Sequence, residues 1–421
     1  MRGPSAIAEG PFLCRWAVPA YLAAMHCFYR LLGDLLVLLS GCPAVAQGVV
    51  TGRVVDEKGQ PVPYASVALA DGRTGTATNE VGEFSLRVPA LPQQLVVLSI
   101  GYGRAGALAT QAGALPVVIV LKASAVELPE VTVRANAEAE ELVARCYAKL
   151  LRHQADAQYG RGFYRQKTRE NGHYRELFDA FYDVKLTPRD MPSWVLGEAR
   201  YAFVPGILSM KNFSIYTRAL PVFQLPGGTS RTAQPLGANA AERFRFVLRQ
   251  TLRDQGRELA VVDFGPRVAG DPVASGTLYI DPRTAALFRF ERDMPTAGNF
   301  TSSNPAIQLG LCTLHTTTNF APLDDSLSRL ASTQVVSNIQ MTMKGVPSET
   351  TTTSQFFLYE YGPPTPGQKY RAMPQDVNDL AEIKKRRYHP EFWRDNAVVK
   401  DSPVEAQVIQ DFEGRRVFGR L

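Results

Sequence analysis

The sequence is poor in histidine and cysteine, the residues that metal sites and nucleophilic sites use most. It has 5 of each among 421 residues. Cys14, Cys27 and Cys42 lie near the N-terminus, which leaves Cys146 and Cys312 in the rest of the chain. We expect these two either to form one disulfide in an oxidising compartment or to be buried thiols. A scaffold held together by many disulfides is excluded.

Long apolar runs are also missing. The run at 31–39 follows Arg30 and is too short to cross a bilayer as a helix of the mature chain. A short apolar run after a positive residue is typical of an export signal, and Met25 is a better start for that signal than Met1. No later stretch has the length and apolar content of a transmembrane helix, so we expect none in the mature protein.

Two cleavage patterns compete at the end of this signal. Ala44, Val45 and Ala46 precede Gln47 and give the small-x-small pattern of ordinary signal peptidase, with cleavage after Ala46. Cys42 ends a Leu-Ser-Gly-Cys lipobox, in which the cysteine would be lipidated and would anchor the protein to a membrane. Both alternatives predict export to the periplasm or the outer membrane.

A strong charge imbalance is absent. The chain has 46 basic and 40 acidic residues, a formal net charge of +6 and a pI of about 9.0. Without a clustered patch or a recognised motif, this excess does not predict nucleic-acid binding. The one dense basic run, 384–387, is followed by Tyr388, Phe392 and Trp393. It is either a contact for anionic lipid headgroups or a solvated helix end.

What the chain does have, from residue 49 onward, is a series of short β-branched runs separated by turn signals. Gly59 and Pro61 end the first run, because glycine adopts turn conformations and proline cannot continue a strand ladder. Such runs at short spacing predict an all-β sandwich. The predicted strands are 49–56, 64–69, 84–88, 95–100, 115–121 and 128–133.

The same region carries the pattern G-x-V-x-D-x-x-G-x-P-V-P-Y-A-S-V, then G-T-x-T-N-x-x-G-x-F-S-L and S-x-x-G-Y. These patterns resemble the carboxypeptidase-regulatory-like domain. The resemblance implies a transthyretin-like β-sandwich of Greek-key type, common in Bacteroidetes envelope proteins, that serves as a structural and interaction module without catalytic residues or a cofactor. The motif positions are Gly52, Asp56, Gly59, Pro61, Tyr64, Ala65, Thr78, Asn79, Gly82, Phe84, Gly101 and Tyr102.

After the sandwich the periodicity changes. Residues 136–158 predict a connector helix, with Asn136 as a candidate cap and acidic residues in its first turn. Residues 159–365 show strand-length apolar runs joined by turns such as 170–172, which predict a large antiparallel sheet, curved or half-barrel in form. Residues 366–421 predict a basic, partly helical tail with a last helix at 403–412.

The hairpin at 276–291 resembles one in outer-membrane lipoprotein-sorting half-barrels, which hold acyl chains in a curved sheet. This resemblance implies a second function, in which the concave β domain carries a lipid or another apolar ligand.

One pattern suggests a metal site. His173 and Glu176 have the His-x-x-Glu spacing of zinc carboxypeptidases, and His315 could supply a third ligand. Three arguments favour a solvated hairpin instead. The sandwich comes before the remaining chain rather than after a catalytic domain, the region is β rather than α/β, and residues three apart on a strand face opposite sides. We predict no catalytic residue, metal or cofactor, with these three residues as the candidates if zinc is bound.

The sequence thus predicts a mainly β protein with an export signal (1–46), a sandwich (47–135), a connector helix (136–158), an antiparallel β domain (159–365) and a tail (366–421). The predicted function is that of a non-enzymatic exported envelope protein. Its sandwich would dock to another envelope protein or outer-membrane component, and its β domain would act in binding or as a scaffold. The apolar-ligand carrier and the zinc hydrolase remain as alternatives.

Overall fold

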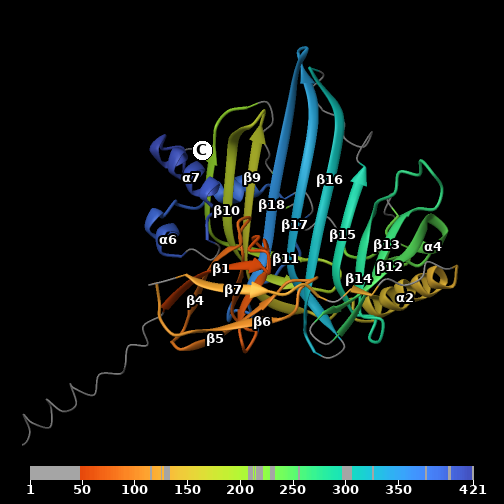
Figure 1. Cartoon of the computed structure of the whole chain (residues 1–421). Coiled ribbons are helices and arrows are strands. Elements are labelled where there is room, and N and C mark those ends of the chain that lie inside the picture. The colour runs from red at the N-terminus through yellow and green to blue at the C-terminus, as the bar shows by residue number, and fades with distance from the viewer. Residues whose placement is uncertain are drawn as a thin grey trace, which may run out of the picture. The chain divides into compact units, whose positions relative to one another are not determined.

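The computed structural model is mainly β, as predicted (Figure 1). Its described residues all belong to one compact unit, 47–421. Among them, no helix combines the length and the apolar content needed to cross a bilayer. Met25, Cys42, Ala46 and Gln47 lie outside the described residues. The described residues are 48–113, 116–124, 126–127, 133–206, 212, 214, 221–227, 233–254, 257–295, 306–324, 327–374, 377–396 and 400–419.

The N-terminal part is a sandwich of two sheets around an apolar core. One sheet has the order β4-β1-β7 and the other β3-β2-β5-β6. The core between them includes Val54, Phe84 and Leu95, all fully buried. The strands are β1 (Gly48–Asp56), β2 (Ser66–Leu69), β3 (Gly75–Ala77), β4 (Glu83–Val88), β5 (Gln93–Leu98), β6 (Ala105–Ala109) and β7 (Val117–Leu121).

Five of the six predicted strands overlap these elements, and two strands, β3 and β6, were not predicted. Both are rich in glycine and alanine, which have low β-propensity, and they form because a neighbouring strand pairs with them. The prediction of a strand at 128–133 is wrong at its end, because Val133 begins a helix. Residues 128–132 lie outside the described part of the chain.

The motif residues build the turns of the sandwich. Gly82 has a φ of +76°, and a Cβ there would meet the carbonyl oxygen of Val54 at 2.5 Å, so the position requires glycine. The Thr78 hydroxyl accepts a hydrogen bond from the Ala65 amide and donates one to the Val62 carbonyl, both 2.8 Å long. These hydrogen bonds join two segments of the motif, which explains why the motif fixes the fold.

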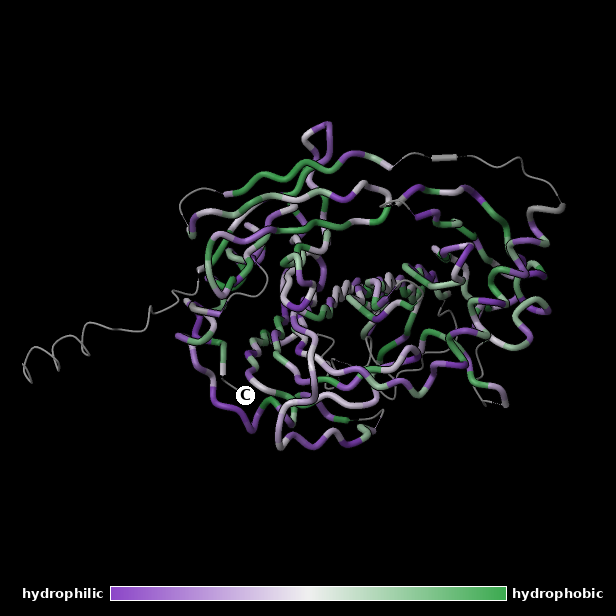
Figure 2. Tube along the Cα trace, turned by 90° about the horizontal axis from the view of Figure 1, so that it is seen from below, coloured by the Kyte–Doolittle hydropathy of each residue, from purple (hydrophilic) through white to green (hydrophobic). Residues whose placement is uncertain are grey.

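The larger part of the chain is one open sheet with antiparallel neighbours throughout. Its order is β11-β10-β9-β18-β17-β16-β15-β14-β13-β12-β8. Buried and more exposed residues alternate along much of strands such as β18, and Figure 2 shows hydrophobic and hydrophilic stretches following one another along the chain. The strands are β8 (Val126–Glu127), β9 (Gln158–Glu170), β10 (His173–Leu186), β11 (Ser193–Phe203), β12 (Phe244–Asp254), β13 (Arg257–Pro266), β14 (Ser275–Ile280), β15 (Leu287–Pro295), β16 (Ile307–Pro322), β17 (Ser328–Met343) and β18 (Val346–Gly362).

Two-residue turns set the register of two of its hairpins. Asn171 and Gly172 join β9 to β10 with φ values of 48° and 83°, the geometry that the predicted turn requires. Lys344 and Gly345 join β17 to β18 in the same way, with 48° and 81°.

Helices cover both faces of this sheet. The predicted connector helix is α2, which packs on β12 and β14 with Leu142 and Cys146 buried. Asn136 is not its cap, and no acidic residue lies in its first turn, because the helix already begins at Val133. Cys146 and Cys312 are both buried and unbonded to each other. The described helices are α2 (Val133–Arg152), α4 (Ala240–Arg243), α5 (Asp379–Lys384), α6 (Pro390–Asp395) and α7 (Pro403–Gly414).

Candidate functional site: a sandwich edge and a cleft

The three zinc candidates lie in different places. His173 is exposed at the mouth of the β9–β10 hairpin, beside α7. The His315 Nδ1 lies 2.7 Å from the Asp293 carboxylate on an exposed part of β16. Strands β9, β18 and β17 separate β10 from β16, which places the two histidines about 19 Å apart across the sheet. Within the described ranges, no three His, Cys, Asp or Glu side chains gather in a way that could hold a metal ion.

A β-bulge in β10 affects the expectation that His173 and Glu176 face opposite sides of the strand. The pairing of β9 with β10 shifts register between Tyr174 and Glu176, so simple strand alternation does not apply from His173 to Glu176. Burial distinguishes them instead, because His173 is exposed and Glu176 is 2% exposed.

Glu176 is a buried carboxylate held by neutral groups. Its oxygens accept hydrogen bonds from the Tyr201 hydroxyl at 2.8 Å and the Thr168 hydroxyl at 2.9 Å, and the Gln166 amide lies at 3.5 Å. Burial raises the pKa of Glu176 to about 7, and these hydrogen bonds offset only part of that rise.

The same face of the sheet continues as a row of buried hydroxyls. Thr352 lies 3.3 Å from Thr168 across the β9–β18 pair. Thr350 and Ser354 are also buried, and their hydroxyl oxygens have no hydrogen-bond partner in the described part of the chain. This stretch of the face is therefore polar rather than aliphatic.

The opposite face carries a buried ion network that sequence reasoning missed. Asp179 is fully buried on β10, and its two oxygens accept hydrogen bonds from Arg165 at 2.7 and 2.9 Å and from Arg200 at 2.8 Å. Burial would raise the pKa of Asp179, but the two guanidinium groups hold it below its ordinary value. Little in the sequence signals it, because Arg165 and Lys167 lie in a strand with many other polar residues, QYGRGFYRQKTRE.

This network fastens the tail to the sheet. Glu405, on α7, lies 3.2 Å from Arg165 and 2.8 Å from Lys167, and Asp401 lies 2.7 Å from Arg165. Glu405 also closes a capping box with Ser402 at the start of α7. Burial would raise the pKa of Glu405, but Arg165 and Lys167 lower it overall. The predicted last helix is thus present, with Glu405 on its buried side.

The basic run at 384–387 is exposed, but the aromatic residues after it point inward. Trp393 is buried against Phe163 and Phe357, and Phe392 packs on Phe181 with ring centroids 5.4 Å apart. Lys385 pairs with Glu382 at 2.7 Å. This arrangement fits a solvated helix end better than an aromatic-assisted lipid contact.

Each sheet of the sandwich has two edge strands, β4 and β7 in one sheet and β3 and β6 in the other; β18 covers the edge next to β3, whereas the edge of β7 is open. At the covered edge, Thr74 bridges to Glu360 of β18, and the Tyr361 amide donates a 3.2 Å hydrogen bond to the Arg73 carbonyl. At the open edge, β7 pairs with β1 on one side, and no strand among the described residues pairs with its other side. Val118 and Val120 on β7 are 61% and 49% exposed.

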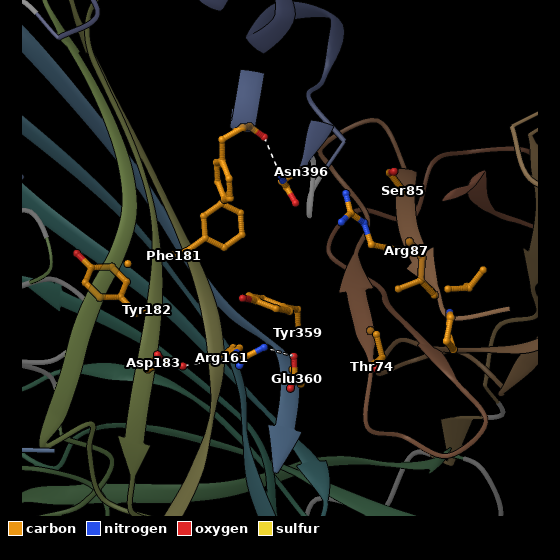
Figure 3. A pocket seen from close by; sticks show the side chains of 16 residues that line it. Thr74, Ser85, Arg87, Arg161, Phe181, Tyr182, Asp183, Tyr359, Glu360 and Asn396 are labelled. Carbon is orange, nitrogen blue, oxygen red and sulfur yellow. Dashed lines mark hydrogen bonds and ion pairs between the residues drawn. The ribbon is translucent and has the colours of Figure 1, made fainter. Parts of the chain in front are cut away.

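A cleft of about 640 Å³ lies between β4 and the strands β9, β10 and β18, with α6 lining one side (Figure 3). Its aromatic wall consists of Phe181, Tyr359 and Phe392. Phe181 meets Tyr359 and Phe392 edge to face, at centroid distances of 6.0 and 5.4 Å. The sequence did not indicate that these three aromatics form one wall, because the strands and the helix that carry them are far apart in the chain.

The floor of the cleft is charged. Arg161 lies 3.2 Å from Glu360 and 3.4 Å from Asp183. The Thr365 hydroxyl also donates to Asp183, at 3.2 Å. Arg87 approaches from the sandwich side, and Figure 3 shows its guanidinium group on the side of the cleft away from Phe181 and Tyr359.

Comparison with known proteins assigns a family to the sandwich. Residues 50–133 match the model of the CarboxypepD_reg-like domain, as predicted. No curated protein matches the chain.

Solved structures that resemble the chain do so distantly. One is a crystal structure of MucB in complex with MucA(peri), with 11% identity, 51% of this chain and 93% of that chain covered, and a TM-score of 0.16. A LolA superfamily protein from Nitrosomonas europaea has 10% sequence identity and a TM-score of 0.19. The match covers 59% of this chain and 98% of that chain. A domain described as a putative outer membrane lipoprotein-sorting protein domain, from Vibrio parahaemolyticus, has 11% sequence identity and a TM-score of 0.19. The match covers 56% of this chain and 95% of that chain. With TM-scores this low, these likenesses have no bearing on what the chain does.

Proposed function

Because residues 50–133 form a carboxypeptidase-regulatory-like domain, we propose that this chain is a non-enzymatic exported protein of the Bacteroidetes-type cell envelope whose sandwich docks a partner protein along β7. The observation that carries the proposal is the open edge of β7, with Val118 and Val120 exposed beside it. The export signal that the sequence predicts at 1–46 supports the location. The β domain supplies the scaffold to which the sandwich is joined.

An open edge strand is a template for another strand. Its unpaired amides and carbonyls can hydrogen-bond to an added chain, and proteins usually protect such edges with charges, proline or bulges. In β7 the protective residues, Pro116 and Lys122, lie only at the two ends of the strand. An extended segment of a partner would satisfy the free backbone groups and cover the two valines. Leu108, on the neighbouring β6, adds a third exposed apolar side chain, at 59%.

The test is a pull-down from envelope extracts of the source bacterium with the V118K/V120K double variant as bait. Lysines on an edge strand disfavour pairing without removing buried contacts. Val346→Lys is the matched control, because Val346 is as exposed as Val118, at 61%, and lies in the β17–β18 hairpin of the large sheet. We expect wild type and the control to recover the same partner and the double variant to lose it. Identical partners for all three proteins would refute the proposal, as would a partner set unchanged by deletion of residues 47–135.

The carrier of an apolar ligand is the weaker candidate. Where the Glu176 face crosses β16 to β18, its buried side chains include Thr316, Ser337, Thr350 and Thr352, which favour polar contacts over an acyl chain. Organic extraction of the purified protein followed by mass spectrometry tests it, and a stoichiometric lipid would revive it.

A further inference from the structure

The cleft beside β4 has a distribution of charge and aromatic surface that the docking function does not use. Its aromatic wall is half-buried, so Phe181, Tyr359 and Phe392 keep part of their surface accessible. Aromatic side chains at right angles to one another present both ring faces and ring edges. Ring faces carry negative electrostatic potential and attract organic cations.

The floor below this wall has an excess of negative charge. Among the residues that the structure describes, Asp183 and Glu360 pair with the same cation, Arg161, so this group of three has a net charge of −1. Burial and the two carboxylates raise the pKa of Tyr359, while Arg161 opposes that rise, so the tyrosine stays neutral. A cation at this end of the cleft would therefore meet both the aromatic faces and the surplus carboxylate.

The other side of the cleft presents a basic side chain. Arg87 is exposed on β4, and Ser85 is the next residue along the strand whose side chain leaves the sandwich on the same side. Asn396 lines the cleft between this side and α6 (Figure 3). Positive charge with a hydroxyl and an amide is the set of groups that binds phosphate or carboxylate.

We infer that this cleft binds a zwitterion, an amine or quaternary ammonium group joined to a phosphate, with the cation over Phe181 and Tyr359 and the phosphate at Arg87. The volume of about 640 Å³ is in the range that small-molecule sites occupy. The same chemistry occurs in a free phosphoamine and in a zwitterionic lipid headgroup. The inference does not depend on β7, and β7 variants leave the cleft unchanged.

The experiment is isothermal titration of the mature chain with phosphocholine, with choline and glycerol 3-phosphate as the two half-ligands. We expect saturable binding of phosphocholine that is about tenfold or more tighter than binding of either half, because both ends of the cleft contribute. Vesicles of phosphatidylcholine and of phosphatidylglycerol distinguish a lipid headgroup from a free phosphoamine as the ligand. Co-sedimentation with phosphatidylcholine vesicles alone identifies a headgroup, and binding of phosphocholine without co-sedimentation identifies a free ligand.

Four variants test which end of the cleft binds the cation and which binds the phosphate. Glu360→Gln should weaken phosphocholine binding about threefold, and Phe181→Leu about threefold to tenfold. Arg87→Gln should reduce the affinity to that of choline. Glu349→Gln is the control, because it makes the same change on the same strand outside the cleft, and it should leave binding unchanged.

Several outcomes would overturn the inference. These are an absence of saturable phosphocholine binding by the folded protein, equal binding of choline and phosphocholine, or equal losses in Glu360→Gln and Glu349→Gln. Far-UV circular dichroism of each variant separates lost binding from lost folding. Phosphocholine binding together with unchanged partner recovery by the β7 variants would refute docking along β7 and leave the inference about the cleft standing.

Discussion

Two buried carboxylates on β10 lie three residues apart and have opposite pKa shifts. Glu176 faces neutral hydrogen-bond donors, and burial raises its pKa to about 7. Asp179 faces Arg165 and Arg200 on the other side of the sheet, and its pKa is lowered despite complete burial. Both carboxylates lie on the same strand and both are buried. The opposite directions of their pKa shifts therefore come from the groups that each face of the sheet packs against.

This comparison shows how the two faces of the sheet are stabilised. The Asp179 face holds α7 and the tail through compensated charges, which are costly to break once buried. The Glu176 face buries a carboxyl group that is most stable when protonated. We expect the contacts on the Asp179 face to lose stability in acid and those on the Glu176 face to lose stability as the pH rises.

The largest effect is expected from Asp179→Asn. The substitution leaves Arg165 and Arg200 buried with less compensating charge, and should lower the free energy of unfolding by about 3–5 kcal/mol. Urea denaturation at neutral pH measures it. Asp293→Asn is the control, since the exposed pair with His315 should be worth less than about 1 kcal/mol. Equal losses in the two variants would break the comparison between buried and exposed pairs.

The next effect is expected at Glu405. Replacing it by glutamine removes the charge that Arg165 and Lys167 share with the tail, at a cost of about 2–3 kcal/mol. The folded pKa of Glu405 is below its unfolded value, so its contribution is present above the unfolded pKa and is lost as the pH falls through the folded one.

Limited proteolysis across acidic pH measures this loss. Cleavage within 400–419 should increase in acid for wild type and already at neutral pH for Glu405→Gln. A tail equally resistant in both proteins would show that the ion pairs do not hold it.

A smaller effect of opposite sign is expected at Glu176. Its folded pKa lies above the unfolded value, so its contribution is complete below pH 4.5 and is lost as the pH rises through about 7. Glu176→Gln should remove this loss, with a gain relative to wild type on the order of 1 kcal/mol between pH 5 and pH 8. Thermal unfolding at the two pH values measures it, and parallel pH profiles for wild type and variant would contradict the assigned environment.

The sandwich was largely predictable because its signals lie within one short, recognisable motif. The turn at Gly82 and the Thr78 hydrogen bonds involve residues that all lie between Val54 and Gly82, and the family motif spans this stretch. The strand β6 was not predictable from Ala105–Ala109, since its pairing with β5 rather than its composition makes it a strand.

The sites were much less predictable, because their parts are distant in the chain. Arg165 meets Glu405 across 240 residues, and no local pattern announces that pairing. Phe181 and Phe392 likewise form one wall only after β10 and α6 pack together. The His-x-x-Glu pattern is the opposite case. Its local spacing suggested a metal site, but the order of the strands places the third candidate ligand, His315, far from His173 and Glu176.

The central claim, docking along β7, is tested most directly by photo-crosslinking in envelope extracts. A benzoylphenylalanine side chain in place of Val118 or Val120 samples the open edge, and one in place of Val346 samples an equally accessible position elsewhere. The account predicts one shared crosslinked envelope protein from the two β7 positions and none from the third. No adduct from β7, or the same adducts from all three positions, would contradict it.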